Sequence, residues 1–204
     1  EIYLDDAMET LGSAVEYAVI FCGMDGQEFL NLFIISGLAN EFGSGNVKYI
    51  SGMSGIEFAR LVLEICGKQC GELHELPYID YPPEYWVGWI LAYYQWYSGK
   101  SFETICKRIA YEDIRNVYGV LHEADLSKAA DVFSRMMNSG QETNLAVQRK
   151  KRGLSQSQLA KAADISIRSI QLYEQRKADI GKAQYNHLAA IAKVLGCTGK
   201  DILE

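Results

Sequence analysis

Cys66, Cys70 and His74 have the spacing C-x3-C-x3-H, and thiolates and imidazoles are side chains that zinc accepts as ligands. On a continuous helix the three would share one face, but Gly67 and Gly71 interrupt the helical pattern. A structural zinc site normally closes with four ligands, and no fourth is evident. We therefore predict no metal site at this segment and expect partly buried thiols.

Groups suited to enzymatic catalysis are sparse in the sequence. His122 and His187 are isolated histidines, and we expect each to be a surface or helix-end residue. The pairs of adjacent carboxylates fall at expected helix starts, where the helix dipole favours negative charge. No phosphate-binding loop, nucleophile elbow or HExxH motif occurs. We predict that the chain is not an enzyme, has no catalytic residues and requires no cofactor.

The stretch LSQSQLAKAADISIRSIQLYEQ, residues 154–175, predicts two short helices joined by a turn. Ser155, with Gln158 three residues later, forms a capping box for the first helix, and Ser166 caps the second. In the second helix Ile170 and Tyr173 point inward. The opposite face carries Ile167, Arg168, Gln171, Leu172 and Gln175. Apolar and amide side chains with a single arginine suit a surface that contacts base edges in DNA.

The two helices must cross closely, and the residues between them and the helix before them determine whether they can. Ala160 and Ala163 point inward with Leu159, and their small size lets the helices approach each other. The helix before them is expected over Glu142–Arg152, with Ser139 and Glu142 forming its capping box. Its last four residues are basic, and glycine ends it.

The string RKKRGLSQSQLAKAADISIRSIQLYEQ, followed by LAAIAKVLGCTGKDIL, resembles the Cro/C1-type (XRE family) helix-turn-helix domain of phage repressors. The resemblance covers about residues 143–203 and implies a five-helix, lambda-repressor-like fold. Asp164 occupies the turn position where the family usually has a left-handed glycine, and Asp tolerates that conformation better than most residues. After Glu174 the family commonly has a glycine and later a proline, and this chain has neither within the next six residues.

The resemblance also implies a binding mode: the second helix in the major groove of double-stranded DNA, as a homodimer on a palindromic operator. Arg168 is expected to contact guanine, and Ile167 and Leu172 to contact thymine methyl groups. The residues expected to contact DNA are Gln156, Ser166, Ile167, Arg168, Ser169, Gln171, Leu172, Arg176 and Lys177.

Charge divides the chain in two. Residues 1–141 contain 9 Lys and Arg against 20 Asp and Glu, a balance of −11, whereas residues 142–204 contain 11 against 6, a balance of +5. Only the second part suits a phosphate backbone. We predict an acidic all-helical domain over 1–138 and the helix-turn-helix domain over 139–204, so that the chain is all-α.

The acidic part shows apolar residues at helical spacing almost throughout. The expected helices end near Gly23, Gly37 and Gly67, the last opening with a capping box of Ser54 and Glu57, and a long one follows over 83–97. Shorter helices are expected over 101–109, 111–121 and 125–138, and an irregular segment over 71–83.

Nine of the twenty residues from Tyr78 to Tyr97 are Tyr or Trp. The stripe of Trp86, Trp89, Tyr93 and Trp96 is either the core face of a helix or an anchor for a partner, because Trp and Tyr dominate binding hot spots. Off that stripe, the candidates for exposed partner-binding residues are Tyr85, Tyr94 and Tyr97.

The hypothesis from the sequence is a sequence-specific transcriptional regulator, a repressor by resemblance, whose acidic domain has a second task. One specialisation is the antitoxin of a toxin–antitoxin pair, in which the acidic domain binds a basic toxin. The alternatives are a small-molecule-sensing regulator and, less favoured, an enzyme targeted to DNA. The longest apolar stretch has 13 residues, against about 20 for a membrane span. We expect no membrane segment or secretory leader, a cytoplasmic location and reduced cysteines.

Overall fold

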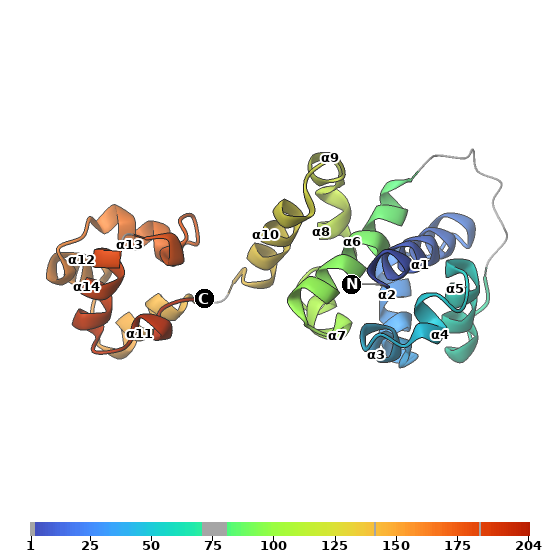
Figure 1. Cartoon of the computed structure of the whole chain (residues 1–204), viewed down its shortest axis with the longest axis horizontal. Helices are drawn as coiled ribbons and strands as arrows, with labels where there is room; N and C mark the ends of the chain where they lie inside the picture. Colours follow the sequence, from blue (N-terminus) through green and yellow to red (C-terminus); the bar gives the residue numbers. More distant parts are fainter. Residues whose placement is uncertain (1–2, 71–80, 141, 184) are drawn as a thin grey trace. The chain divides into compact units, whose positions relative to one another are not determined.

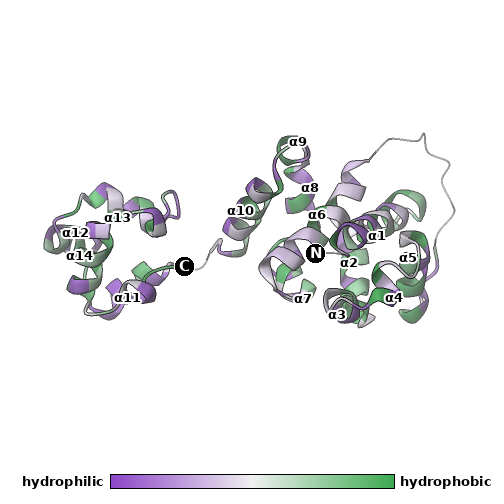
Figure 2. Ribbon diagram, in the orientation of Figure 1, coloured by the Kyte–Doolittle hydropathy of each residue, from purple (hydrophilic) through white to green (hydrophobic). Residues whose placement is uncertain are grey.

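A computed structural model describes residues 3–70, 81–140, 142–183 and 185–204, and within these ranges every regular element is a helix (Figure 1). The predicted all-α class is confirmed. The chain divides into two compact units, Glu1–Met137 and Asn138–Glu204. Each has its own hydrophobic core. In both units single helices carry hydrophobic and hydrophilic residues together, as amphipathic helices around a core do (Figure 2).

The first unit begins with α1 (Leu4–Glu16), which continues as the π-helix η1 (Tyr17–Phe21). Next come α2 (Gly26–Ile35), α3 (Leu38–Gly43), α4 (Val47–Ile50) and α5 (Gly55–Ile65). After the long α6 (Pro83–Ser98) follow α7 (Phe102–Cys106), α8 (Tyr111–Asn116), α9 (Tyr118–Leu121) and α10 (Leu126–Met137).

Local sequence explains several helix starts. Ser54 and Glu57 form the predicted capping box of α5, with Glu57 accepting from the Ser54 backbone N–H at 2.8 Å. Pro83 is the first residue of α6, where its missing N–H costs nothing. One predicted helix over 111–121 is wrong: Val117 separates α8 from α9. The short α3 and α4 were not expected, because pieces of four to six residues show too little periodicity.

The core of the first unit centres on α6, which packs along α1 (Figure 1). Gly88 of α6 makes this close crossing possible, because a Cβ there would lie 2.3 Å from the backbone oxygen of Leu11. A second part of the core is a cluster of phenylalanine rings, most of which pack edge to face. Its members are Phe33, Phe42, Phe58 and Phe102.

The burial of the aromatic residues of α6 differs in part from the prediction. Tyr94 was expected to be exposed but is 1% exposed, so that prediction is wrong. Its ring packs 5.2 Å from that of Phe133, and its hydroxyl lies 3.3 Å from the hydroxyl of Ser134. Both partners belong to α10, which covers a face of α6 that helical periodicity alone leaves open. Tyr97 is 59% exposed, as predicted.

The second unit contains α11 (Asn144–Lys151), α12 (Gln156–Ala163), α13 (Ile167–Glu174) and α14 (Tyr185–Leu195), with 3-10 turns η2 (Ile180–Lys182) and η3 (Gly199–Asp201). The predicted capping role of Ser139 is wrong. Thr143 caps α11 instead, its hydroxyl accepting from the N–H of Ala146 at 3.1 Å. Gly140, at φ 77°, takes a left-handed conformation between α10 and this cap.

The expectation that all cysteines are reduced is wrong. Cys22 and Cys70 form a disulfide across 48 residues of sequence, so the prediction of reduced thiols fails for these two. Cys66, Cys106 and Cys197 are free and half-buried. Cys70 is thereby engaged and offers no thiolate to a metal, while His74 lies outside the described residues.

Candidate DNA-binding site

The site is built on the turn between α12 and α13. Asp164 ends α12 at φ 53° and ψ 46°, in the left-handed conformation expected for it. The N–H of Ile165 then donates to the carbonyl of Ala160 at 2.9 Å, which closes the turn. Ala160 and Ala163 are buried between the helices, as their small size predicts. The turn therefore fixes how α13 leaves α12.

Hydroxyl caps set the first turn of each helix. Ser155 accepts from the N–H of Gln158 at 3.1 Å, and the Gln158 side chain accepts from the N–H of Ser155 at 2.7 Å. Ser166 accepts from the N–H of Ser169 at 3.0 Å, and their two hydroxyls lie 2.8 Å apart. Both predicted caps are confirmed. Ser166 and Ser169 thus hold the start of α13 in place.

The outer face of α13 has the predicted character. Ile167 is 45% exposed and Arg168 is also exposed, whereas Ile170 is fully buried against the core of the unit. Gln171 and Leu172 are half-buried on the following turn. An apolar side chain and a guanidinium therefore stand side by side at the exposed start of the helix, a combination able to meet thymine methyl groups and guanine acceptors.

A buried ion pair holds α13 against α11. Arg149 donates to Glu174 through Nε at 2.6 Å and Nη2 at 2.9 Å, and both side chains are about one-tenth exposed or less. The remaining Nη1 donates to the Leu154 carbonyl at 2.7 Å. This bidentate geometry ties the end of α13 to α11, the first helix of the unit. From the sequence, Arg149 was expected only as one of four basic residues at the end of a helix.

The same carboxylate positions Gln156. The amide of Gln156 donates to Glu174 at 2.8 Å, which places this half-buried side chain at the start of α12. Burial acts to raise the pKa of Glu174, but the hydrogen bonds from Arg149 and Gln156 outweigh it and hold the pKa below its usual value. Glu174 is therefore ionised at neutral pH, and its charge is matched inside the fold.

The two basic residues that follow α13 differ in whether they form an ion pair within the fold or are exposed. Arg176 adopts φ 53°, near the point where the family commonly has glycine, and its guanidinium pairs with Glu204 at 2.5 and 2.9 Å. Glu204 also accepts from the N–H of Asn144 at 3.3 Å. Lys177 is exposed. Of these two predicted DNA contacts, Arg176 would have to leave a carboxylate to meet a phosphate, whereas the Lys177 side chain is open to solvent.

The acidic unit holds the predicted partner-binding residues. Tyr97 is exposed, and its ring stacks 6.0 Å from Tyr93. Tyr85 is half-buried; burial first, and then the nearby Glu9 carboxylate, raise the pKa of its hydroxyl to about 12. Tyr85 is thus a neutral hydrogen-bonding group at neutral pH. Tyr97 is the more accessible of the two.

Comparison with known proteins identifies the second unit. Residues 145–202 match the helix-turn-helix family, of the Cro/C1 type that the sequence resembles. No curated protein and no solved structure matches the chain. In the ranges that the structure describes, no helix has the length and apolar character to cross a membrane, and no cluster of three or more His, Cys, Asp or Glu is arranged to hold a metal ion.

Proposed function

We propose that this DNA-binding transcription regulator is a sequence-specific repressor that binds a palindromic operator as a homodimer. The observation that carries the proposal is the exposed pair Ile167 and Arg168 at the start of α13, on a helix whose other end is fixed by the Arg149–Glu174 ion pair. Base readout needs side chains presented on a rigid helix at the depth of the major groove. The positive balance of residues 142–204 supplies attraction to phosphates.

Arg168→Ala is expected to weaken binding to the operator by roughly 5- to 150-fold, the range of one lost bidentate base contact, with little effect on random DNA. The operator is first selected from a randomised DNA library with the full-length protein, and both affinities are then measured at one salt concentration.

Arg168→Lys serves as the matched variant. A lysine keeps the charge but loses the planar pair of donors, so Arg168→Lys is expected to bind random DNA as wild type does and to lose the preference for the operator. Equal losses on both DNAs in Arg168→Ala, rescued by lysine, would reduce Arg168 to a phosphate contact.

Lys177→Ala is expected to lower the slope of log affinity against log salt by about 0.9, the share of one phosphate contact, whereas Arg176→Ala changes it less. The reason is that Arg176 is already paired with Glu204. Glu204→Gln should then raise DNA affinity by releasing a cation, and a titration at four salt concentrations separates the three variants. A full unit of slope lost in Arg176→Ala would show that this guanidinium moves to the DNA.

For the acidic unit we propose binding of a basic protein, with a cognate toxin as the specialised case. The balance of −11 over residues 1–141 and the exposed Tyr97 support a charged surface with an aromatic anchor. Affinity capture from the source cell uses the full chain as bait, with the Tyr97→Ala variant as the matched control.

The outcomes of the capture separate two functions. A small basic protein that is lost with Tyr97→Ala, is encoded beside this gene and is toxic unless co-expressed with it supports the antitoxin function. Absence of any such protein, together with a ligand-dependent rise in melting temperature, would favour a small-molecule sensor instead.

A further inference from the structure

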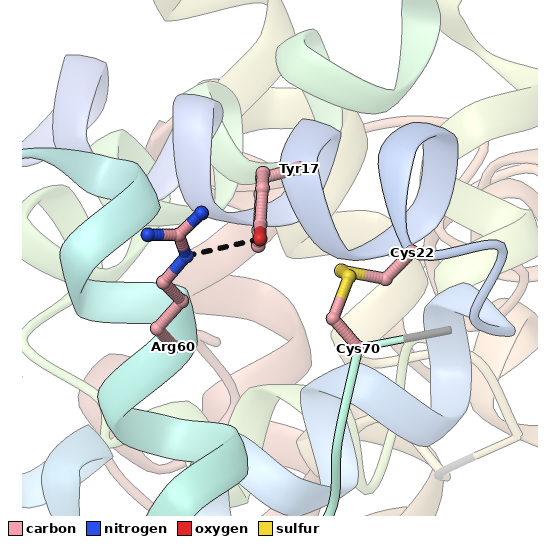
Figure 3. The surroundings of a disulfide bond; sticks show 4 residues. All are labelled: Tyr17, Cys22, Arg60 and Cys70. Carbon is pink, nitrogen blue, oxygen red and sulfur yellow. Dashed lines mark hydrogen bonds between the residues drawn. A yellow bond between two sulfur atoms is a disulfide. The ribbon is translucent and has the colours of Figure 1, made fainter. Parts of the chain in front are cut away.

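The Cys22–Cys70 disulfide links the end of η1 to the segment that follows α5 (Figure 3). Cys22 directly follows the π-helix η1, in which α1 ends, and Cys70 lies five residues after the end of α5. π-helical turns are uncommon and frequently occur at functional sites. The bond therefore closes a large loop at the point where α1 departs from regular α-helical geometry.

The two cysteines of the disulfide differ in exposure. Cys22 is 8% exposed, whereas Cys70 is half-buried and follows the exposed residues Gly67, Lys68 and Gln69. Thiol–disulfide exchange requires an incoming thiolate to reach one sulfur while the other leaves. Cys70 is the more exposed residue and lines a pocket, so its sulfur is the expected point of attack and Cys22 the leaving group.

An open pocket of about 680 Å³ adjoins Cys70 and carries charge of both signs. Arg60 lines it, with its Nε donating to the Tyr17 hydroxyl at 3.0 Å and its guanidinium over the Tyr17 ring (Figure 3). In the described part of the chain, the terminal nitrogens of Arg60 make no hydrogen bond. Glu64 also lines the pocket, as does Lys68, whose Nζ pairs with Glu28 Oε1 at 3.0 Å. The Arg60 guanidinium is therefore the cation that can meet a carboxylate of a small zwitterion, and the Glu64 carboxylate can meet its amine.

We propose that the Cys22–Cys70 disulfide is a reversible thiol-exchange site for a small peptide thiol with two carboxylates and one amine, the charge pattern of glutathione. The inference rests on the proposed function, because a repressor works beside DNA in a compartment that keeps thiols reduced, and disulfides there are usually catalytic or redox-sensing. The acidic unit then reports the redox state of that compartment.

The exchange runs in two balanced steps. The thiolate of the peptide attacks Cys70 Sγ, a new S–S bond forms, and the Cys22–Cys70 bond breaks, with Cys22 leaving as a thiolate that takes a proton from water. A second peptide thiolate then attacks the peptide sulfur of this mixed disulfide. Cys70 leaves as a thiolate, and the two peptides depart joined by a disulfide. The two peptide thiols are thus oxidised, and the protein disulfide is reduced to two thiols.

The first experiment equilibrates the full-length protein with glutathione at graded ratios of reduced to oxidised form, followed by alkylation and intact-mass measurement. The expected result is a sigmoidal change between disulfide and dithiol within that range, with the dithiol form melting on the order of 10 °C lower because a long loop is released. A protein that stays fully oxidised or fully reduced at every ratio would overturn the proposal.

The second experiment tests the pocket through the rate of disulfide opening in the full chain. Arg60→Gln is expected to slow opening by glutathione several-fold, and opening by cysteamine, a cationic thiol, should be unchanged or faster because a like charge is removed. Lys128→Gln, an exposed cation on α10, is the matched control and should slow neither reaction. Equal slowing of both thiols by Arg60→Gln, or no slowing at all, contradicts recognition by this pocket.

The site of attack is read from Cys22→Ser mixed with oxidised glutathione and mapped by peptide mass. The adduct is expected on Cys70. Burial raises the pKa of Cys106 to about 12, so this thiol has little thiolate to react. An adduct mainly on Cys66 or Cys106 would refute Cys70 as the reacting sulfur.

These measurements need no DNA, so they remain decisive if operator binding fails. Operator affinity is measured separately on the fully oxidised and fully reduced proteins. If neither form selects an operator while the redox titration succeeds, the proposed function fails and the exchange site stands. If an operator is selected but the redox titration shows no transition, only the proposed exchange site is rejected.

Discussion

Arg149→Ala is expected to destabilise the C-terminal unit by about 3–5 kcal/mol, because it leaves the buried carboxylate of Glu174 without its charged partner. It also removes the donor to the Leu154 carbonyl. A domain of this size has a stability of only about 3–10 kcal/mol, so most of the operator-binding activity should be lost with the fold. Urea unfolding followed by circular dichroism measures the change.

Two variants show whether the cause is the unpaired charge. Lys151→Ala removes an exposed cation from the same helix and should change stability by less than about 0.5 kcal/mol. The double variant Arg149→Met with Glu174→Leu removes both charges and should recover much of the loss. If the double variant is no more stable than Arg149→Ala, the packing of the arginine matters more than its pairing.

The same ion pair gives the unit a defined acid sensitivity. The pKa of Glu174 is lowered in the folded state, so its contribution is fully present above its unfolded pKa of about 4.5. That contribution is lost as pH falls through the lower, folded value. Stability of wild type is therefore expected to fall below about pH 4.5. Glu174→Gln should flatten this part of the profile, and an unchanged slope would contradict the assignment.

Gly88→Ala is expected to destabilise the N-terminal unit by about 1–3 kcal/mol or more, because a Cβ at Gly88 would lie 2.3 Å from the Leu11 carbonyl oxygen. The obstacle is backbone of α1, which a change of rotamer does not relieve. Separation of α1 from α6 would disturb the largest interface of the unit's core. Differential scanning calorimetry of the full chain measures the effect.

Gly119→Ala is the matched control for that substitution. Gly119 also lies in a helix, but a Cβ there meets nothing within 4 Å, so alanine should stabilise the unit by about 0.5–1 kcal/mol through helix propensity. Opposite signs for the two glycines establish that the α1–α6 crossing sets the requirement. Similar small effects at both would mean that the crossing adjusts freely.

Much of the candidate site is predictable because its determinants are local. The caps at Ser155 and Ser166 and the left-handed turn at Asp164 depend on residues within four positions of each other, and all three are found as predicted. The exposure of Ile167 and Arg168 follows from the position of Ile170 on the same helix. What such spacing omits is the ion pair that joins Arg149 to Glu174 across 25 residues.

The all-helical class, the acidic and basic parts and the helix-turn-helix domain could be predicted before the fold was known, because composition, caps and periodicity act along the chain. Three features depend on tertiary packing instead: the burial of Tyr94 under α10, the need for glycine at position 88 and the pairing of Cys22 with Cys70. Each of these depends on which distant segment arrives at a given face. That choice is made by packing of the whole unit, and no local pattern encodes it.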